Sequence, residues 1–178
     1  DTGTDPGVVD SDGDGFSDGD EVLGTSGGLN LRGMGADPNH KDIFLEVDWL
    51  PDDEISNCGG TDLRPPDEVF ELLVRAFTQA PVQNRNGETG VALHVDYGQG
   101  DGFTGGNLIP DADSFLDGEL DGEFAAHKAA NFATNREGYF HYSIRAHSFT
   151  AGAGGLGYRP GFDFFVTQGC TAVSDVFT

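Results

Sequence analysis

The twelve residues from Asp10 to Glu21 have the composition and spacing of a calcium-binding loop. Acidic residues alternate along its first half, a glycine stands at the sixth position and a glutamate at the twelfth. Calcium takes about six to eight oxygen ligands, and the glycine allows the sharp turn that directs them to one centre. A solvated acidic linker, the alternative, would have Gly15 and Glu21 at these positions only by chance. The expected ligands are Asp10, Asp12, Asp14, the carbonyl of Phe16, Asp18 directly or through water, and a bidentate Glu21.

The segments that flank this loop do not have the composition of long helices. Residues 1–9 are rich in glycine and proline, so no entering helix is expected, and after the loop only Asp18–Leu23 has room to turn helically before Gly24. The stretch Asp18-Gly-Asp-Glu-Val-Leu-Gly-Thr25 resembles the loop-dominated thrombospondin type 3 and dockerin-like calcium repeats. The resemblance implies that the ion replaces a hydrophobic core and that calcium binding and folding are one event.

The charge of the chain limits its partners. Its 178 residues include 9 basic and 31 acidic side chains, which gives a formal net charge of -22. Such a charge repels nucleic acid and anionic membrane surfaces and attracts divalent cations. No apolar run reaches the roughly eighteen residues of a membrane-spanning helix, so no membrane insertion is expected. The length allows one core of ordinary size with an appendage.

The chain ends and the cysteines favour a secreted or cell-surface location. The sequence begins without a methionine or a signal peptide, within what resembles the tail of a preceding acidic repeat, Asp1–Pro6. We therefore expect a trimmed piece of a longer secreted precursor. In an oxidising exterior Cys58 and Cys170 are predicted to form a disulfide, with two unpaired buried thiols as the alternative.

The composition of the sequence changes near residue 40, from glycine- and aspartate-rich to segments with a regular apolar pattern. Alternation over Asp42–Leu50 predicts a strand with Ile43 and Leu45 on one face and Glu46 and Asp48 on the other. A proline followed by acidic residues and apolar residues at helical spacing predicts a helix. The expected elements are strands at 42–50, 90–97, 139–147 and 162–167 and helices at 66–77 and 123–131, with a flexible loop at 152–157.

This order of elements predicts an α/β fold with a single mixed sheet and two or so helices. We expect a calcium-binding repeat segment at 1–36 and an α/β domain at 37–178. The connection at 107–123 holds further carboxylates, which suggest a second cation site. A solvated loop is the alternative there, because no frame reproduces the calcium-loop spacing. The candidate ligands of this second site are Asp111, Asp113, Asp117, Glu119 and Asp121.

Several stretches resemble a family of secreted microbial proteins in which calcium repeats precede a zincin-like metallopeptidase domain. The likeness extends over about residues 35–170. The resemblance implies a zincin-type α/β domain whose zinc is bound by a later helix carrying an HExxH motif. This chain departs from the family there, since it ends at Thr178, about where that helix would begin. The stretches that carry the likeness are Gly35–Trp49, Ala76–Pro81, Leu93–Asp96, Gly138–His147 and Gly161–Val166.

The histidines of the chain do not replace that motif. HExxH places two histidines one helical turn apart on the zinc, with the glutamate as general base. His141 and His147 are expected about 20 Å apart along one strand. His94 shares a strand face with Asp96 and could form a polar pair with it, but a satisfied sheet histidine is the expectation. His127 has no partner at ligand spacing.

Two classes of function are compatible with these patterns. The first is an extracellular calcium-binding structural or assembly module, such as a subunit of a calcium-bridged homo-oligomer or filament. The alternative is the non-catalytic N-terminal part of a secreted zinc metallopeptidase, an enzyme only if the precursor continues past residue 178. No nucleophile elbow, phosphate-binding glycine loop or dinucleotide fingerprint occurs. Because the HExxH ligands and base are missing, the chain alone is expected to hydrolyse no peptide. Calcium is the cofactor that the sequence predicts.

Overall fold

The protein has the α/β fold that the sequence predicts. The computed structural model describes residues 3–52, 62–111, 114–117, 122–149, 154–157 and 161–167. Short 3-10 turns at Arg32–Met34 and Thr134–Arg136 accompany the regular elements. In chain order the helices and strands are α1 (Asp18–Leu23), β1 (Asp42–Trp49), α2 (Asp67–Thr78), β2 (Ala92–Asp96), β3 (Phe115–Leu116), α3 (Glu123–Asn131), β4 (Phe140–Ala146), β5 (Ser148–Phe149), β6 (Gly155–Gly157) and β7 (Asp163–Thr167).

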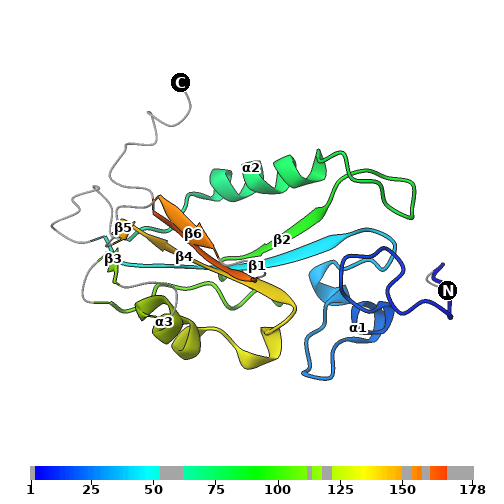
Figure 1. Cartoon of the computed structure of the whole chain (residues 1–178), viewed down its shortest axis with the longest axis horizontal. Helices are drawn as coiled ribbons and strands as arrows, with labels where there is room; N and C mark the ends of the chain where they lie inside the picture. The colour runs from blue at the N-terminus through cyan, green and yellow to red at the C-terminus, as the bar shows by residue number, and fades with distance from the viewer. Residues whose placement is uncertain are drawn as a thin grey trace. The chain divides into compact units, whose positions relative to one another are not determined.

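One mixed sheet of five strands organises the described residues (Figure 1). Its order is β2-β1-β4-β7-β6, with β4 and β7 parallel and β6 and β7 antiparallel. The strands β3 and β5 form a separate parallel pair. No helix in the described ranges is long and apolar enough to cross a membrane.

The predicted strands and helices are confirmed, with differences only at their ends. The helix expected at 123–131 coincides with α3, and the helical turn expected after the calcium loop is α1. The expectation of a flexible loop at 152–157 is wrong for Gly155–Gly157, which pairs with β7 as β6. A Cβ on Gly155 would lie 2.9 Å from the carbonyl oxygen of Phe165, so this close pairing requires glycine. Three residues without an apolar pattern give no periodicity from which to predict a strand.

The strand β1 is covered on both faces. Its alternation predicts an apolar face and a carboxylate face, but Glu46 and Asp48 are both 0 % exposed, while Ile43 on the apolar face is only half-buried. The carboxylate of Asp48 accepts hydrogen bonds from the hydroxyl of Tyr142 at 2.6 Å and from the main-chain and side-chain nitrogens of Asn107 at 2.8 and 3.0 Å. A buried carboxylate with several donors is stable away from water, which explains how a polar residue occupies this interior position.

The chain divides into two compact units, which we describe separately. One comprises residues 1–45, 66–104 and 133–140, and the other comprises residues 46–65, 105–132 and 141–178. We call them unit 1 and unit 2. The predicted boundary between residues 36 and 37 is not a boundary of these units and stays a prediction.

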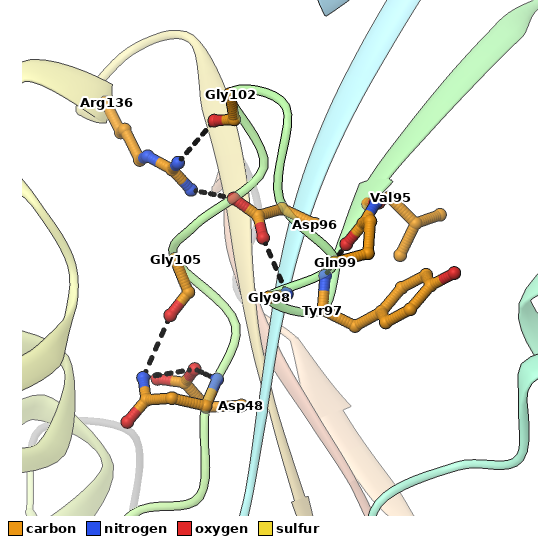
Figure 2. Close-up of polar contacts among 10 residues, drawn as sticks. Asp48, Val95, Asp96, Tyr97, Gly98, Gln99, Gly102, Gly105 and Arg136 are labelled. Carbon is orange, nitrogen blue, oxygen red and sulfur yellow. Dashed lines mark hydrogen bonds and ion pairs between the residues drawn. The ribbon is translucent and has the colours of Figure 1, made fainter.

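In unit 1 the helix α2 lies along β2 (Figure 1). Pro66 precedes the helix, acidic residues occupy its first turn, and Phe70 on its inner face stacks on Tyr97 with ring centroids 4.4 Å apart. Beyond β2, the guanidinium of Arg136 points to the carboxylate of Asp96 and the carbonyl of Gly102 (Figure 2). Because Asp96 is 0 % exposed, this 2.6 Å ion pair neutralises a charge that would otherwise be costly to bury.

In unit 2 the helix α3 packs on β4 and β7 through aromatic side chains. The ring of Phe124 contacts Tyr142 and Phe165, with centroids 5.6 and 6.5 Å apart. Lys128, one helical turn after Phe124, forms an ion pair of 2.8 Å with Asp163 at the start of β7. These contacts fix the rotation of α3 and therefore the direction in which its remaining face points.

Candidate calcium site

The predicted calcium loop is wound around its own carboxylates. The carboxylate of Asp10 accepts hydrogen bonds from the main-chain nitrogens of Gly13 at 2.7 Å and Gly15 at 3.1 Å. Gly13 and Gly15 have φ angles of 79° and 105°, a left-handed conformation that glycine adopts without strain. The carboxylate of Asp14 accepts from the main-chain nitrogen of Phe16 at 2.8 Å, and Asp12 accepts from that of Asp14. The turn therefore brings the carboxylates of its first half close together.

Glu21 is buried beside these carboxylates, in an environment that is unfavourable for an ionised carboxylate without a partner. It belongs to the first turn of α1, is 1 % exposed, and neither carboxylate oxygen has a hydrogen-bond partner among the described residues. One oxygen of Asp12, which is 9 % exposed, is likewise buried without a hydrogen bond. Native proteins almost always satisfy such atoms, so a missing ligand is the simplest explanation of these orphaned oxygens.

The acidic residues that face one another form two overlapping groups. In the first, one oxygen each from Asp10, Asp12 and Asp14 lies within 4.8 Å of the others. In the second, the same holds for Asp14, Glu21 and Asp42. Asp14 is common to both groups, so the two together form one cluster, which we call the Asp14 cluster.

Electrostatics give the Asp14 cluster a strong affinity for positive charge. Burial, reinforced by the negative charges of Asp14, Asp12 and Asp42, raises the pKa of Glu21 from 4.5 to about 9. Burial and then the neighbouring Asp14 raise the pKa of Asp12 from 3.8 to about 6. Burial also raises the pKa of Asp14. At pH 7 without a cation Glu21 retains its proton, and a divalent cation would displace it.

Asp42 is the member of the cluster that the sequence did not predict. It is the first residue of β1, is 2 % exposed, and its main-chain nitrogen donates to Asp14 at 2.8 Å. Its carboxylate accepts from the main-chain nitrogen of Asp37 at 2.9 Å and contacts Nε2 of His94 at 2.5 Å. No spacing rule relates Asp42 to the loop, because the fold and not the local sequence brings it there.

His94 is the satisfied histidine that was expected, and the alternative pair with Asp96 does not form. His94 contacts Asp42 and stacks on Phe44 with ring centroids 4.5 Å apart, whereas Asp96 pairs with Arg136. A Cβ on Gly35 would lie 2.7 Å from Cε1 of His94, so the absence of a side chain there makes room for the imidazole ring. The histidine thus orients a carboxylate of the Asp14 cluster from outside it.

Asp18 holds the loop closed rather than joining the cluster. Its two oxygens accept hydrogen bonds of 2.8 Å from the main-chain nitrogen and the hydroxyl of Ser11. These bonds lower the pKa of Asp18, although burial opposes them. A direct bond from Asp18 to an ion would require these contacts to break, whereas a bridging water would not.

The side chain of Phe16 attaches the loop to the core of unit 1. It is 7 % exposed, and its ring lies 5.8 Å from that of Phe44 and 5.9 Å from that of Tyr139, measured between centroids. The hydroxyl of Tyr139 donates to Asp20 of α1 at 3.1 Å. The loop and β1 therefore contact each other through aromatic packing as well as through carboxylates.

The second predicted cation site is described only in part. Asp113, Glu119 and Asp121 lie outside the described residues, as do Cys58 and Cys170, so the structure adds nothing on the predicted disulfide. Asp111 lies 2.8 Å from Nε2 of His127, measured from Oδ2, and the main-chain nitrogen of Asp117 donates to Glu123 at 2.7 Å. The prediction that His127 has no partner at ligand spacing is therefore wrong, since Asp111 and Glu123 lie beside it.

Comparisons with protein-family models, with curated proteins and with solved structures found no match to this chain.

Proposed function

We propose that residues 10–21 bind calcium and that the ion stabilises the α/β fold by joining the loop to the start of β1. The observation that carries this proposal is Glu21, whose two oxygens are buried beside other carboxylates without a hydrogen bond. A bound cation would satisfy both oxygens and remove the repulsion among the carboxylates.

The ligand atoms favour calcium over other cations. Every candidate atom in the Asp14 cluster is a carboxylate oxygen, which suits a hard cation, and the expected loop carbonyl would add another oxygen. Magnesium usually keeps several waters and demands a compact octahedron, whereas calcium accepts a larger and less regular set of oxygens. The imidazole of His94 contacts Asp42 and holds this carboxylate in place without itself belonging to the cluster.

The biological role that follows is that of an extracellular calcium-stabilised structural or assembly module. Extracellular calcium modules bind with dissociation constants of about 10⁻⁴ to 10⁻³ M, so they are occupied outside cells and empty inside them. A net charge of -22 supports the same role, because divalent counter-ions reduce the repulsion between chains that pack closely. The alternative role in a zinc metallopeptidase rests on the sequence resemblance alone.

Calorimetric titration of calcium tests the proposal. We expect one saturable binding event with a dissociation constant in the range given above, and a loss of at least about tenfold in affinity in Glu21→Gln. The matched control is Glu71→Gln, which removes the same charge from an exposed position of α2. A magnesium titration under the same conditions should show weaker binding.

Two results would contradict the proposal. Equal calcium affinity in Glu21→Gln and in the wild type would show that this carboxylate is not a ligand. An equal loss in Glu71→Gln would show that calcium responds to the overall charge of the protein and not to the Asp14 cluster.

A further inference from the structure

We propose that unit 2 contains a second metal site of a different chemical type, formed by Asp111, Glu123 and His127, which binds a transition-metal dication such as zinc. One ligand atom of each residue lies within 4.8 Å of the other two. Nε2 of His127 is 2.8 Å from Oδ2 of Asp111 and 4.0 Å from Oε1 of Glu123. The site is independent of the calcium loop and shares no residue with it.

The geometry of His127 distinguishes this cluster from an ordinary ion pair. Although Oδ2 of Asp111 is close, Nε2 of His127 is buried and has no hydrogen bond of acceptable geometry among the described residues. The carboxylate oxygen therefore lies off the axis along which the ring nitrogen donates or accepts. Two ligands that are cis about an ion at about 2.1 Å lie about 3 Å apart, so this offset is the arrangement expected when the axis points at a metal.

The helix supplies two of the ligands in a fixed orientation. Glu123 and His127 are four residues apart on α3, so they lie on the same face of the helix. The main-chain nitrogen of Asp117 donates to Oε2 of Glu123 at 2.7 Å, which leaves Oε1 as the oxygen facing His127. A second-shell hydrogen bond of this kind is typical of metal-binding carboxylates.

The packing of α3 on the sheet fixes the direction in which this face points. Phe124 contacts the rings of Tyr142 and Phe165, and Lys128 is paired with Asp163. The side chains of His127, Asp111 and Glu123 are 14, 11 and 30 % exposed, so the cluster is largely desolvated and still reachable by an ion.

The donor set determines the class of metal. One imidazole nitrogen and two carboxylate oxygens suit zinc, manganese and related dications, whereas calcium prefers an all-oxygen shell. Two ionised carboxylates and a neutral imidazole carry a charge of about minus two, which one dication neutralises. Three protein ligands leave at least one position for water or an outside ligand, as in zinc sites that are not purely structural.

Cobalt is a suitable probe because it takes the place of zinc and absorbs visible light when protein ligands bind it. The titration is done on the whole chain with calcium in excess, so that the loop is already occupied. We expect one equivalent of cobalt to develop a visible absorption band, and zinc to abolish it by competition. Loss of second-shell partners alone weakens metal binding about 10–100-fold, so His127→Ala should lose at least about tenfold in affinity.

The matched control is His141→Ala, which removes another histidine of unit 2. His141 is on β4, where its Nδ1 lies 3.2 Å from the carbonyl oxygen of Phe162, and it belongs to no ligand cluster among the described residues. Cobalt affinity should be unchanged in this variant. Asp111→Asn provides the same test as His127→Ala if circular dichroism shows that the latter is misfolded.

Three outcomes would overturn the proposal. The first is a wild-type titration without a visible band, the second is equal cobalt affinity in a folded His127→Ala or Asp111→Asn variant, and the third is an equal loss in His141→Ala. Calcium binding by the loop is measured separately in the same variants. Because Glu21→Gln should leave the cobalt band intact, failure of the calcium site and failure of the second site are distinguishable.

Discussion

Glu21→Gln is expected to stabilise the metal-free protein and to remove most of the stabilisation that calcium gives the wild type. In the metal-free protein, Glu21 is a buried carboxylate among carboxylates, and its pKa rises from 4.5 to about 9. A group with a raised pKa binds its proton more tightly in the folded chain than in the unfolded chain. Its contribution to stability is therefore fully present below pH 4.5 and is lost progressively as the pH rises towards about 9.

The size of the effect at neutral pH follows from the same pKa. At pH 7 the unfolded chain has ionised Glu21 and the folded chain has not, which lowers the free energy of unfolding by up to about 3 kcal/mol relative to pH 4.5. Glutamine cannot ionise, so the metal-free variant should be more stable than the metal-free wild type by up to that amount. For a chain of this size the melting temperature would rise by about 6–12 °C.

Calcium should narrow the difference in stability between the wild type and the variant. At about 10 mM calcium, a site of the expected affinity adds about 1.4–2.7 kcal/mol to the stability of the wild type. This gain corresponds to about 3–10 °C in melting temperature. The variant, which lacks the bidentate ligand, should gain little.

Thermal unfolding followed by circular dichroism, in chelator and in calcium at pH 7, measures all four values. Glu71→Gln controls for the loss of one negative charge at an exposed position. A metal-free Glu21→Gln protein that is less stable than the metal-free wild type would refute the reasoning, because Glu21 would then be satisfied without a cation. Equal calcium-induced shifts in the two proteins would also refute it.

Four further predictions concern the same site. Calcium binding at pH 7 should release close to one proton, because the pKa of Glu21 is about 9 without the ion. The calcium affinity should therefore rise with pH up to about 9. Calorimetry at several pH values, in buffers of different ionisation enthalpy, measures both. Asp42→Asn should weaken calcium binding although it lies outside the loop, and unchanged affinity would remove it from the ligand set. Phe16→Ala should lower the free energy of unfolding by about 3–5 kcal/mol in urea titrations, both with and without calcium, because it empties a buried ring position. Calcium should promote assembly of this strongly acidic chain, and light scattering that reports a monomer from chelator to millimolar calcium would reject assembly.

The loop and the main elements could be predicted because their signals are local. The spacing of acidic residues and glycines over residues 10–21 identifies a loop that folds around its own carboxylates, and the 3.6-residue apolar period identifies α2. Asp42 could not be found in this way, since a strand that happens to begin beside the loop places it there. The same is true of His127, whose partner Asp111 comes from a separate segment of the chain. Spacing within one helix could have drawn attention only to Glu123 and His127.

The orphaned oxygens of Glu21 also explain why calcium should act on the sheet and not only on the loop. The main-chain nitrogen of Asp42 donates to Asp14, and its carboxylate belongs to the cluster and contacts His94. Asp42 is also the first residue of β1. Removal of the ion would therefore leave repelling carboxylates at the start of β1, where His94 of β2 is also held. Because Phe44 two residues later packs on Phe16 of the loop, strain at Asp42 cannot be relieved without disturbing that contact. We therefore propose that calcium acts at the point where the loop, β1 and β2 depend on one another, so that its removal lowers the stability of all three.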